Sequence, residues 1–390
     1  MSRYDQYKEK VIVYRRYMHE HPELSFEEYE TAKYIRQILS ALPNCKVIQL
    51  TETSTVAVFN EGKGKKIGLR ADIDALPVGE ECDHLEYKSR AEGKMHACGH
   101  DGHAAILLGA AHYFNDHSER LANEIHCIFQ HAEELIPGGA REMVATGYFD
   151  DFDFIYGHHL WAIMDTGLID IKSGPASANS DLYELTIQGK GGHSSQPHLC
   201  IDPIVIGSQF ISALQTITSR QIDPYDSAVI SNTVFQAGVV GAENVIPEKI
   251  LLKGSVRTTT DSARSLIESQ LKNMIDHLCG MYGASYDFNY IRGYDAVIND
   301  DKMTAEVRKI AEGLYPGKII TEPPMMGGED FSAFSRLVPS VYTFIGSGLK
   351  DEESRHPHHH PRFEMDEESF EIGFEMFVEV AEQIFSNEAC

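Results

Sequence analysis

The chain reads CGHDGHAAILLGAAH over residues 98–112, a loop rich in cysteine, histidine and aspartate that leads directly into an apolar, helix-like stretch. Short apolar runs of strand length alternate with such helical stretches on both sides of it, at residues 55–59, 67–69, 125–129 and 154–156. This alternation predicts an α/β fold, a layered domain built around a mixed, largely buried sheet.

Polar side chains follow three of these predicted strands. In a sheet of this kind the ends of neighbouring strands meet at one edge, which is where binding clefts form. We therefore expect one cleft to collect the side chains of Asp72 and Asp74, of Glu133 and Glu134, and of His158.

The first forty residues predict two helices, at 4–20 and 25–40, separated by Pro22. Ser25 and Glu28 have the spacing of a capping box, in which two side chains bind the unpaired backbone N–H groups at the start of a helix. The adjacent acids Glu27 and Glu28 are interpreted as solvated surface, like the other exposed-looking glutamate pairs of the chain.

A second domain is predicted within the first. From Leu182 the pattern becomes a compact succession of short strands and two helices, typical of an α+β unit. Histidines return at residues 356–360, so the chain re-enters the first domain after this insertion. The predicted boundaries are 1–178 and 292–390 for the metal-binding catalytic domain and 179–291 for the inserted domain.

Composition limits the classes of partner. The 390 residues include 59 acidic and 34 basic side chains, and the net charge of −25 opposes a nucleic acid or an anionic membrane. No apolar run approaches the roughly 18 residues that span a bilayer. The seven cysteines show no disulfide framework. We expect a cytoplasmic protein with a small-molecule substrate, in a reducing compartment that keeps Cys98 available as a ligand.

The cysteine and histidine loop itself predicts a metal centre, because thiolate, imidazole and carboxylate groups bind transition metals. Taken alone, Cys98 would more often be a small buried apolar residue, but His100 two positions on and the acids downstream favour ligation. A thiol hydrolase with Cys98 as nucleophile and His100 as base is disfavoured. Residues two apart on a loop seldom reach that geometry, and the acids would have no role.

Seven motifs follow one another over nearly the whole chain: Gly68–Pro77, His96–His103, Glu133-Glu134, Gly191–Ser195, Asn244–Pro247, Arg257-Thr258 and Gly328–Phe331. Together and in this order they resemble the amidohydrolase branch of the aminoacylase and carboxypeptidase metallopeptidases. That branch includes hippurate hydrolases, auxin-conjugate hydrolases and N-acetyl-diaminopimelate deacetylases.

The resemblance implies two divalent transition-metal ions, which could be zinc, manganese, cobalt or nickel. The implied ligands are Cys98, His100, Glu134, His158 and one late histidine. The family's pattern of histidine, any residue, proline, any residue, phenylalanine places that late ligand at His359, with His358 as a competitor. Glu133 is implied as the general base, with Asp74 orienting a ligand or the base.

For the inserted domain, the resemblance implies a lid and dimerisation role. His193 would reach the cleft of a partner subunit in a homodimer or dimer-based oligomer and stabilise the oxyanion, while Asn244 and Arg257 would bind the substrate carboxylate. The predicted activity is cleavage of N-acyl amino acids by a metal-bridged water. A dipeptidase or carboxypeptidase with the same site is the nearest alternative, and a metal-dependent binding protein for acylated amino acids is the non-enzymatic one.

Overall fold

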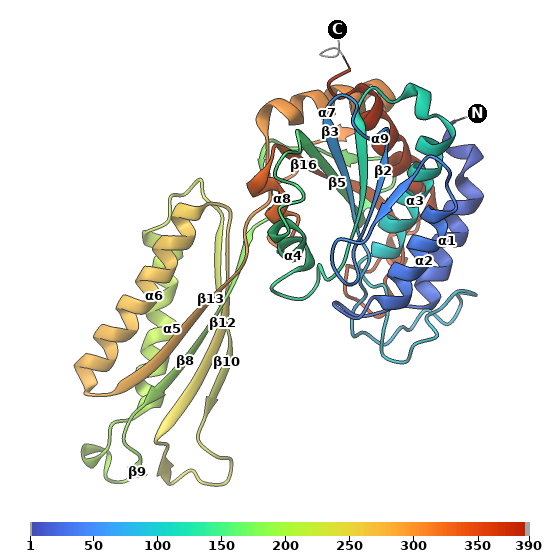
Figure 1. Cartoon of the computed structure of the whole chain (residues 1–390). Coiled ribbons are helices and arrows are strands. Elements are labelled where there is room, and N and C mark those ends of the chain that lie inside the picture. Colours follow the sequence, from blue (N-terminus) through green and yellow to red (C-terminus); the bar gives the residue numbers. More distant parts are fainter. Residues whose placement is uncertain (1, 387–390) are drawn as a thin grey trace. The chain divides into compact units, whose positions relative to one another are not determined.

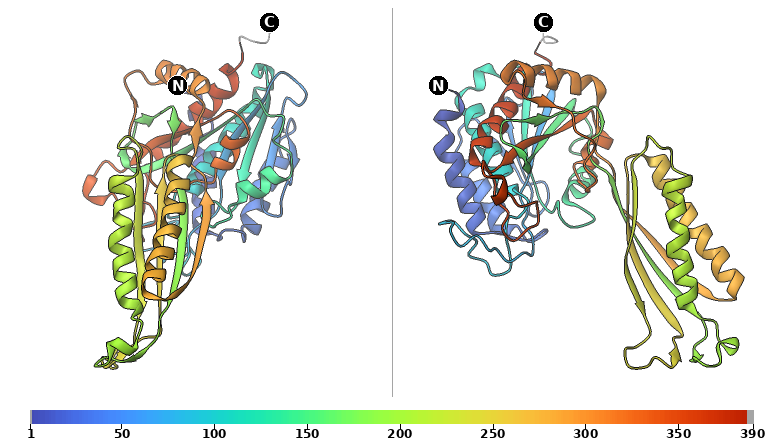
Figure 2. Two further views of the ribbon diagram at one scale, coloured as in Figure 1. Left: turned by 90° about the vertical axis from the view of Figure 1, so that its left-hand side faces the viewer. Right: turned by 180° about the vertical axis from the view of Figure 1, so that it is seen from behind.

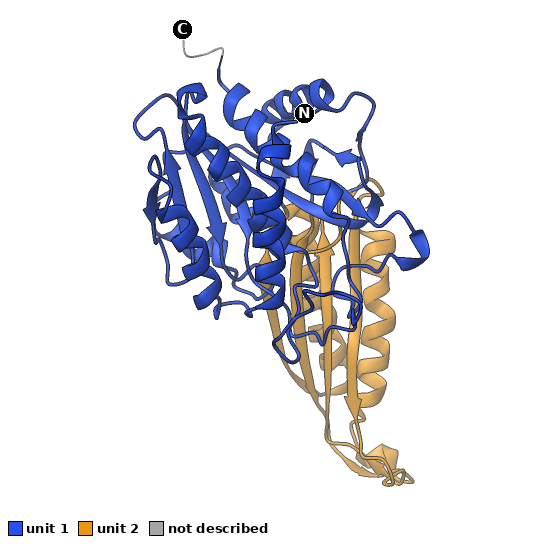
Figure 3. Ribbon diagram, turned by 90° about the vertical axis from the view of Figure 1, so that its right-hand side faces the viewer, with its two compact units in different colours: residues 1–176, 297–323, 330–390 blue, residues 177–296, 324–329 orange. Residues whose placement is uncertain are grey.

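The computed structural model describes residues 2–386 and divides into two compact units. Unit 1 comprises residues 1–176, 297–323 and 330–390, and unit 2 comprises residues 177–296 and 324–329 (Figure 3). The sequence predicts an insertion at 179–291, whereas unit 2 begins at residue 177, extends to 296 and also includes the short segment 324–329.

Unit 1 is built on an eight-stranded mixed sheet (Figure 1). Strands β3, β4, β5 and β16 at its centre are mutually parallel, whereas β1 and β2 pair antiparallel at one edge. This confirms the predicted layered α/β class. In spatial order the strands are β1 (Lys46–Ile48), β2 (Thr55–Phe59), β4 (Glu124–Gln130), β3 (Lys66–Asp72), β5 (Phe154–Asp165), β16 (Ser340–Gly348), β6 (Ile169–Asp170) and β15 (Ile319–Ile320).

Helices cover this sheet and bury it. Helix α3 packs against α1, α9 and strand β3, whereas α4 contacts α8 and strand β4. A two-stranded pair, β7 (Gly174–Pro175) with β14 (Ile298–Asn299), completes the unit. The helices are α1 (Lys8–Glu20), α2 (Tyr29–Ser40), α3 (His100–Asp116), α4 (Gly139–Ala145), α7 (Asp301–Leu314), α8 (Ser332–Leu337) and α9 (Phe370–Gln383).

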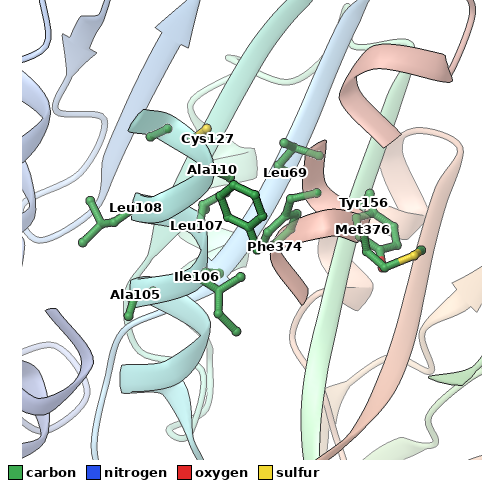
Figure 4. Packing of buried hydrophobic residues seen from close by; sticks show 14 of the residues in the cluster. Leu69, Ala105, Ile106, Leu107, Leu108, Ala110, Cys127, Tyr156, Phe374 and Met376 are labelled. Atoms are coloured by element: carbon green, nitrogen blue, oxygen red, sulfur yellow. The ribbon is translucent and has the colours of Figure 1, made fainter. Parts of the chain in front are cut away.

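The core between α3, the central strands and α9 is apolar and closely packed (Figure 4). Leu107 of α3, Leu69 of β3, Tyr156 of β5 and Phe374 of α9 are all fully buried in it. Because α3 is buried on nearly every side, its first residue, His100, is held by the packing of the whole helix.

Unit 2 is a four-stranded antiparallel sheet in the order β10 (Ala228–Ala237), β12 (Lys249–Thr258), β8 (Asn179–Gln188), β13 (Ser285–Tyr294). Helices α5 (Pro203–Arg220) and α6 (Asp261–Tyr282) both pack on it (Figure 2). Alternate side chains of β8, such as Leu185 and Ile187, enter the core with the helices. A small ribbon of β9 (Gly192–His193) and β11 (Val245–Ile246) extends from this unit.

The start of α2 differs from the prediction. The helix begins at Tyr29, and the carboxylate of Glu23 accepts the N–H groups of Glu30 and Thr31 at 3.2 and 2.7 Å. The predicted capping box is therefore wrong. Ser25 donates to Asp74 instead, and Glu28 is fully buried rather than solvated. None of the described helices has the length and apolarity needed to cross a membrane.

Candidate metal centre

The loop before α3 brings Cys98 and His100 into one group with Glu134. Ligand atoms of these three residues lie within 4.8 Å of one another. Gly99 between the first two has φ = 90°, in the left-handed region that favours glycine, so the backbone can turn sharply into the helix. The structure thus unites three of the five predicted ligands, from segments that are distant in the sequence.

His100 is oriented by Asp74, as the resemblance implied. His100 Nδ1 lies 3.0 Å from the backbone oxygen of Asp74 and 3.2 Å from its Oδ1. This leaves Nε2 buried, without a hydrogen-bond partner among the described residues, and 3.9 Å from Glu134 Oε1. Burial alone would lower the pKa of His100, but the charges of Asp72, Asp74 and Glu134 outweigh it and raise the pKa to about 10.

Asp74 also fixes Glu134. Its Oδ2 accepts the backbone N–H of Glu134 at 3.0 Å and the hydroxyl of Ser25 at 2.7 Å. The same carboxylate therefore supports two candidate ligands from different segments, which is the arrangement that keeps metal ligands in a fixed geometry.

The histidine that reaches the group from β5 is His159, not His158. Adjacent residues of a strand point to opposite faces. The ring of His158 packs 4.2 Å from that of Phe377 on α9, and neither of its nitrogens has a hydrogen-bond partner among the described residues. His159 donates from Nδ1 to the Leu160 oxygen at 2.7 Å, which leaves its Nε2 lone pair 3.5 Å from Cys98 Sγ. We therefore replace His158 by His159 in the proposed ligand set.

The two competing late histidines have different surroundings. His359 Nε2 lies 3.2 Å from Glu134 Oε1 and is half-exposed. His358 Nε2 accepts the N–H of Ala162 at 3.2 Å, so its proton is on Nδ1, which faces Cys98 Sγ at 3.7 Å. His358 therefore acts as a donor to the sulfur, and His359 stays the proposed ligand.

A divalent cation suits this donor set. Burial raises the pKa of the Cys98 thiol well above its usual value, and the charges of Glu134 and Glu133 raise it further. A bound cation would reverse this effect, since metal ligation deprotonates a thiol. Thiolate, imidazole and carboxylate donors converge here around the unpartnered Nε2 of His100, and they match the ligands of a transition metal.

His103 belongs to a buried polar network rather than to the ligand set. Its Nδ1 donates to Asp72 at 2.6 Å, and its Nε2 accepts the N–H of Leu160 at 2.9 Å, so both nitrogens are used. Asp72 and Asp330 are joined by Arg70, at 2.7 and 2.9 Å. The sequence analysis assigned no role to Arg70 or Asp330, although both lie in the quoted motifs.

Glu133 is buried beside this network and is only 6% exposed. One of its carboxylate oxygens lies within 4.8 Å of one from Asp330. Its charge also acts on Cys98, since it contributes to the raised pKa of that thiol. The carboxylate of Glu133 thus lies close to the candidate metal centre, and Glu133 directly precedes the candidate ligand Glu134 in the sequence.

In unit 2 the three predicted residues do not meet. His193 on β9 is paired with β11, and the backbone oxygen of the preceding Asn244 accepts the N–H of Ser194 at 2.9 Å. Arg257, which binds Ser180, lies eight residues along β12 from Lys249, or about 27 Å at the rise of an antiparallel strand. His193 and Asn244 are neighbours, and Arg257 is at the other end of the sheet.

Comparison with known proteins identifies the family. Residues 68–383 match the model described as Peptidase family M20/M25/M40. The chain belongs to this family. It is 42% identical to an N-acyl-L-amino acid amidohydrolase of Geobacillus stearothermophilus over 76% of this chain and 80% of the relative. It is 36% identical to thermostable carboxypeptidase 2 of Saccharolobus solfataricus over 93% of this chain and 92% of the relative.

A solved structure of a family member shares the fold. A dinuclear metal-binding peptidase of this family from Bacillus subtilis is 32% identical, with a TM-score of 0.83 over 97% of this chain and 98% of the other. The resemblance drawn from the motifs is thereby confirmed. Together with the clustered donors described above, it supports two divalent ions as cofactors of this family member.

The exchange of His158 for His159 is testable by metal content. His159→Ala should weaken binding of one ion by more than the ~10–100-fold that follows loss of an outer partner, because a direct ligand is removed. His158→Leu should keep two ions per chain, since that side chain packs on Phe377. Elemental analysis after dialysis measures both. Metal loss in the leucine variant with retention in His159→Ala would restore His158 as the ligand.

Metal binding should release protons. In the metal-free protein at pH 7, the raised pKa values keep the Cys98 thiol and the His100 ring protonated, and both must deprotonate to bind. About two protons should leave, so affinity should rise with pH. Calorimetry in buffers of different ionisation enthalpy counts these protons. Cys98→Ser should release about one fewer, and equal release in the two proteins would contradict the assignment.

Proposed function

We propose that this chain is a metal-dependent amidohydrolase that cleaves N-acyl amino acids to a carboxylate and a free amino acid. The observation that carries the proposal is the buried carboxylate of Glu133 beside a group of Cys98, His100 and Glu134. A site that only binds its ligand has no use for a base next to a metal ligand. The amidohydrolase relative adds support for acylated amino acids as the substrate class.

The protein groups divide the chemistry among them. Two divalent ions held by Cys98, His100, Glu134, His159 and His359 would polarise the amide carbonyl and acidify a water molecule. Glu133 would take the proton of that water and deliver it to the leaving nitrogen, so that the amine departs neutral. Asp74 keeps the His100 ring and the Glu134 backbone in place while this happens.

The identity of the metal is set by the ligands only in part. The proposed thiolate and imidazoles suit zinc, cobalt or nickel, whereas the carboxylate also admits manganese. A reducing, cytoplasmic location fits this proposal, because an oxidised Cys98 sulfur could not serve as a ligand.

The geometry of unit 2 favours a homodimer. A single amino acid cannot span the ~27 Å along β12 that separates Arg257 from the end of the sheet near His193 and Asn244. We propose that Arg257 binds the substrate carboxylate, while His193 and Asn244 act in the site of the partner. His193 would then stabilise the oxyanion, a contribution of roughly 3 kcal/mol in comparable sites.

Carboxypeptidase activity is the second candidate, and the carboxypeptidase relative favours it. The same ions and base would cleave a peptide bond next to a free carboxylate. The two activities differ in the group on the acyl side, so a panel of N-acetyl amino acids and unblocked dipeptides, followed by mass spectrometry, distinguishes them.

Removal of the base should abolish hydrolysis without removing metal. Glu133→Gln keeps the size of the side chain but cannot accept a proton, so kcat should fall by about 10²–10⁴-fold. Steady-state kinetics on N-acetyl amino acids, with metal content measured in parallel, tests this. Glu353→Gln, at an exposed glutamate pair, is the control and should match the parent protein. An unchanged rate of hydrolysis in Glu133→Gln would contradict the proposed role of Glu133 as the general base.

Mixing two inactive variants should restore activity if His193 acts across subunits. A dimer of one His193→Ala chain and one Glu133→Ala chain contains one complete site. After random exchange of subunits, activity should reach about a quarter of the parent value. Each variant alone should stay inactive. A mixture that stays inactive, although exchange is shown by mass spectrometry of the intact dimers, would place His193 in its own subunit's site.

A further inference from the structure

The turn that carries Glu133 has a strained backbone. Ala132, directly before Glu133, has φ = 50°, in the left-handed region that residues other than glycine rarely adopt. A conformation of this kind costs free energy, and it persists only where surrounding groups hold it. Something must therefore fix the backbone just ahead of the proposed base.

Two hydrogen bonds hold Ala132: its oxygen accepts the N–H of Gly139 at 2.9 Å, and its N–H donates to the carboxylate of Glu28. Glu28 Oε1 accepts the N–H of Ala132 at 2.7 Å and the N–H of Phe26 at 3.0 Å. Phe26 has φ = 66°, so one oxygen binds both of these left-handed residues. The Phe26 ring also packs edge-on against His131, with ring centroids 5.6 Å apart.

Glu28 does not cap the helix that it precedes. It occupies the N-cap position of α2 but makes no capping bond, because Glu23 binds the first N–H groups of that helix. It is fully buried, and burial together with the charge of Asp74 raises its pKa to about 7. Burying a carboxyl group costs free energy unless it is hydrogen-bonded. The hydrogen bonds from the backbone of the turn to Glu28 offset this cost.

On the far side of Glu133, Asp74 accepts the N–H of Glu134 at 3.0 Å. Two buried carboxyl groups thus bind the backbone immediately before and after Glu133. Both belong to the same neighbourhood, since Ser25, three residues before Glu28, donates to Asp74.

We propose that Glu28 is a positioning residue for Glu133: by binding the Ala132 N–H it sets the turn that aims the base. This inference rests on the function proposed above. It assigns to Glu28 no contact with substrate or with metal. It requires the acceptor oxygen of the side chain, and the negative charge is not needed.

The experiment compares three variants. Glu28→Leu fills the space without an acceptor and should lower kcat by about 10–100-fold, with KM changed by less than about threefold and two ions per chain retained. Glu28→Gln keeps the acceptor oxygen and should stay within about threefold of the parent kcat. Glu27→Gln, at the exposed neighbour, should match the parent protein. Should Glu28→Leu fail to fold, Glu28→Ala, which leaves room for a water molecule, takes its place.

Amide hydrogen exchange of the metal-free proteins gives a second reading that does not depend on activity. The peptide containing Ala132 should exchange about tenfold faster or more in Glu28→Leu than in the parent, and Glu28→Gln should resemble the parent. An unchanged exchange rate, a parental kcat in Glu28→Leu, or a Glu28→Gln variant as impaired as Glu28→Leu would overturn the inference. If the parent protein itself hydrolyses no amide, the proposed function fails, and the exchange rates still decide whether Glu28 holds the turn.

Discussion

The carboxylate of Asp74 is the interaction on which the rest of this site depends. It receives hydrogen bonds from three segments far apart in the sequence: Ser25 from the loop before α2, His100 from the start of α3, and the backbone of Glu134 after β4. Asp74 is itself 1% exposed and follows a central strand. A buried carboxyl group of this kind is stable only when fully hydrogen-bonded, so the three segments must arrive together.

The fold class and the position of the site could be predicted from the sequence, because both follow from local patterns of apolar and polar residues. Apolar runs of strand length gave the layered α/β class, and their ends located Asp74, Glu133 and Glu134 at one edge of the sheet. The relevant information lies within a few residues of each strand. The family resemblance added the order of the motifs, which no local pattern contains.

The expectations that differ from the structure concern neighbouring residues of the same type, between which local pattern cannot choose. His158 and His159 differ only in the face of β5 that they occupy, and that depends on where the strand registers with β16. Glu27 and Glu28 also look alike, yet one is exposed and the other binds Ala132. The N–H group that Glu28 binds lies 104 residues away, and only the tertiary fold brings it there.

The peptide group of Leu160 has a consequence for how the protein exchanges its cofactors. Its N–H donates to His103, and its oxygen accepts the N–H of His159. The ring of His159, the proposed ligand, is therefore oriented by a hydrogen bond to the protein and not only by the metal. His100 is clamped in the same way by Asp74. A scaffold of this kind keeps its form when ions depart. Both rings are therefore positioned for an ion before one arrives, and no refolding of these segments is needed for an ion to bind again.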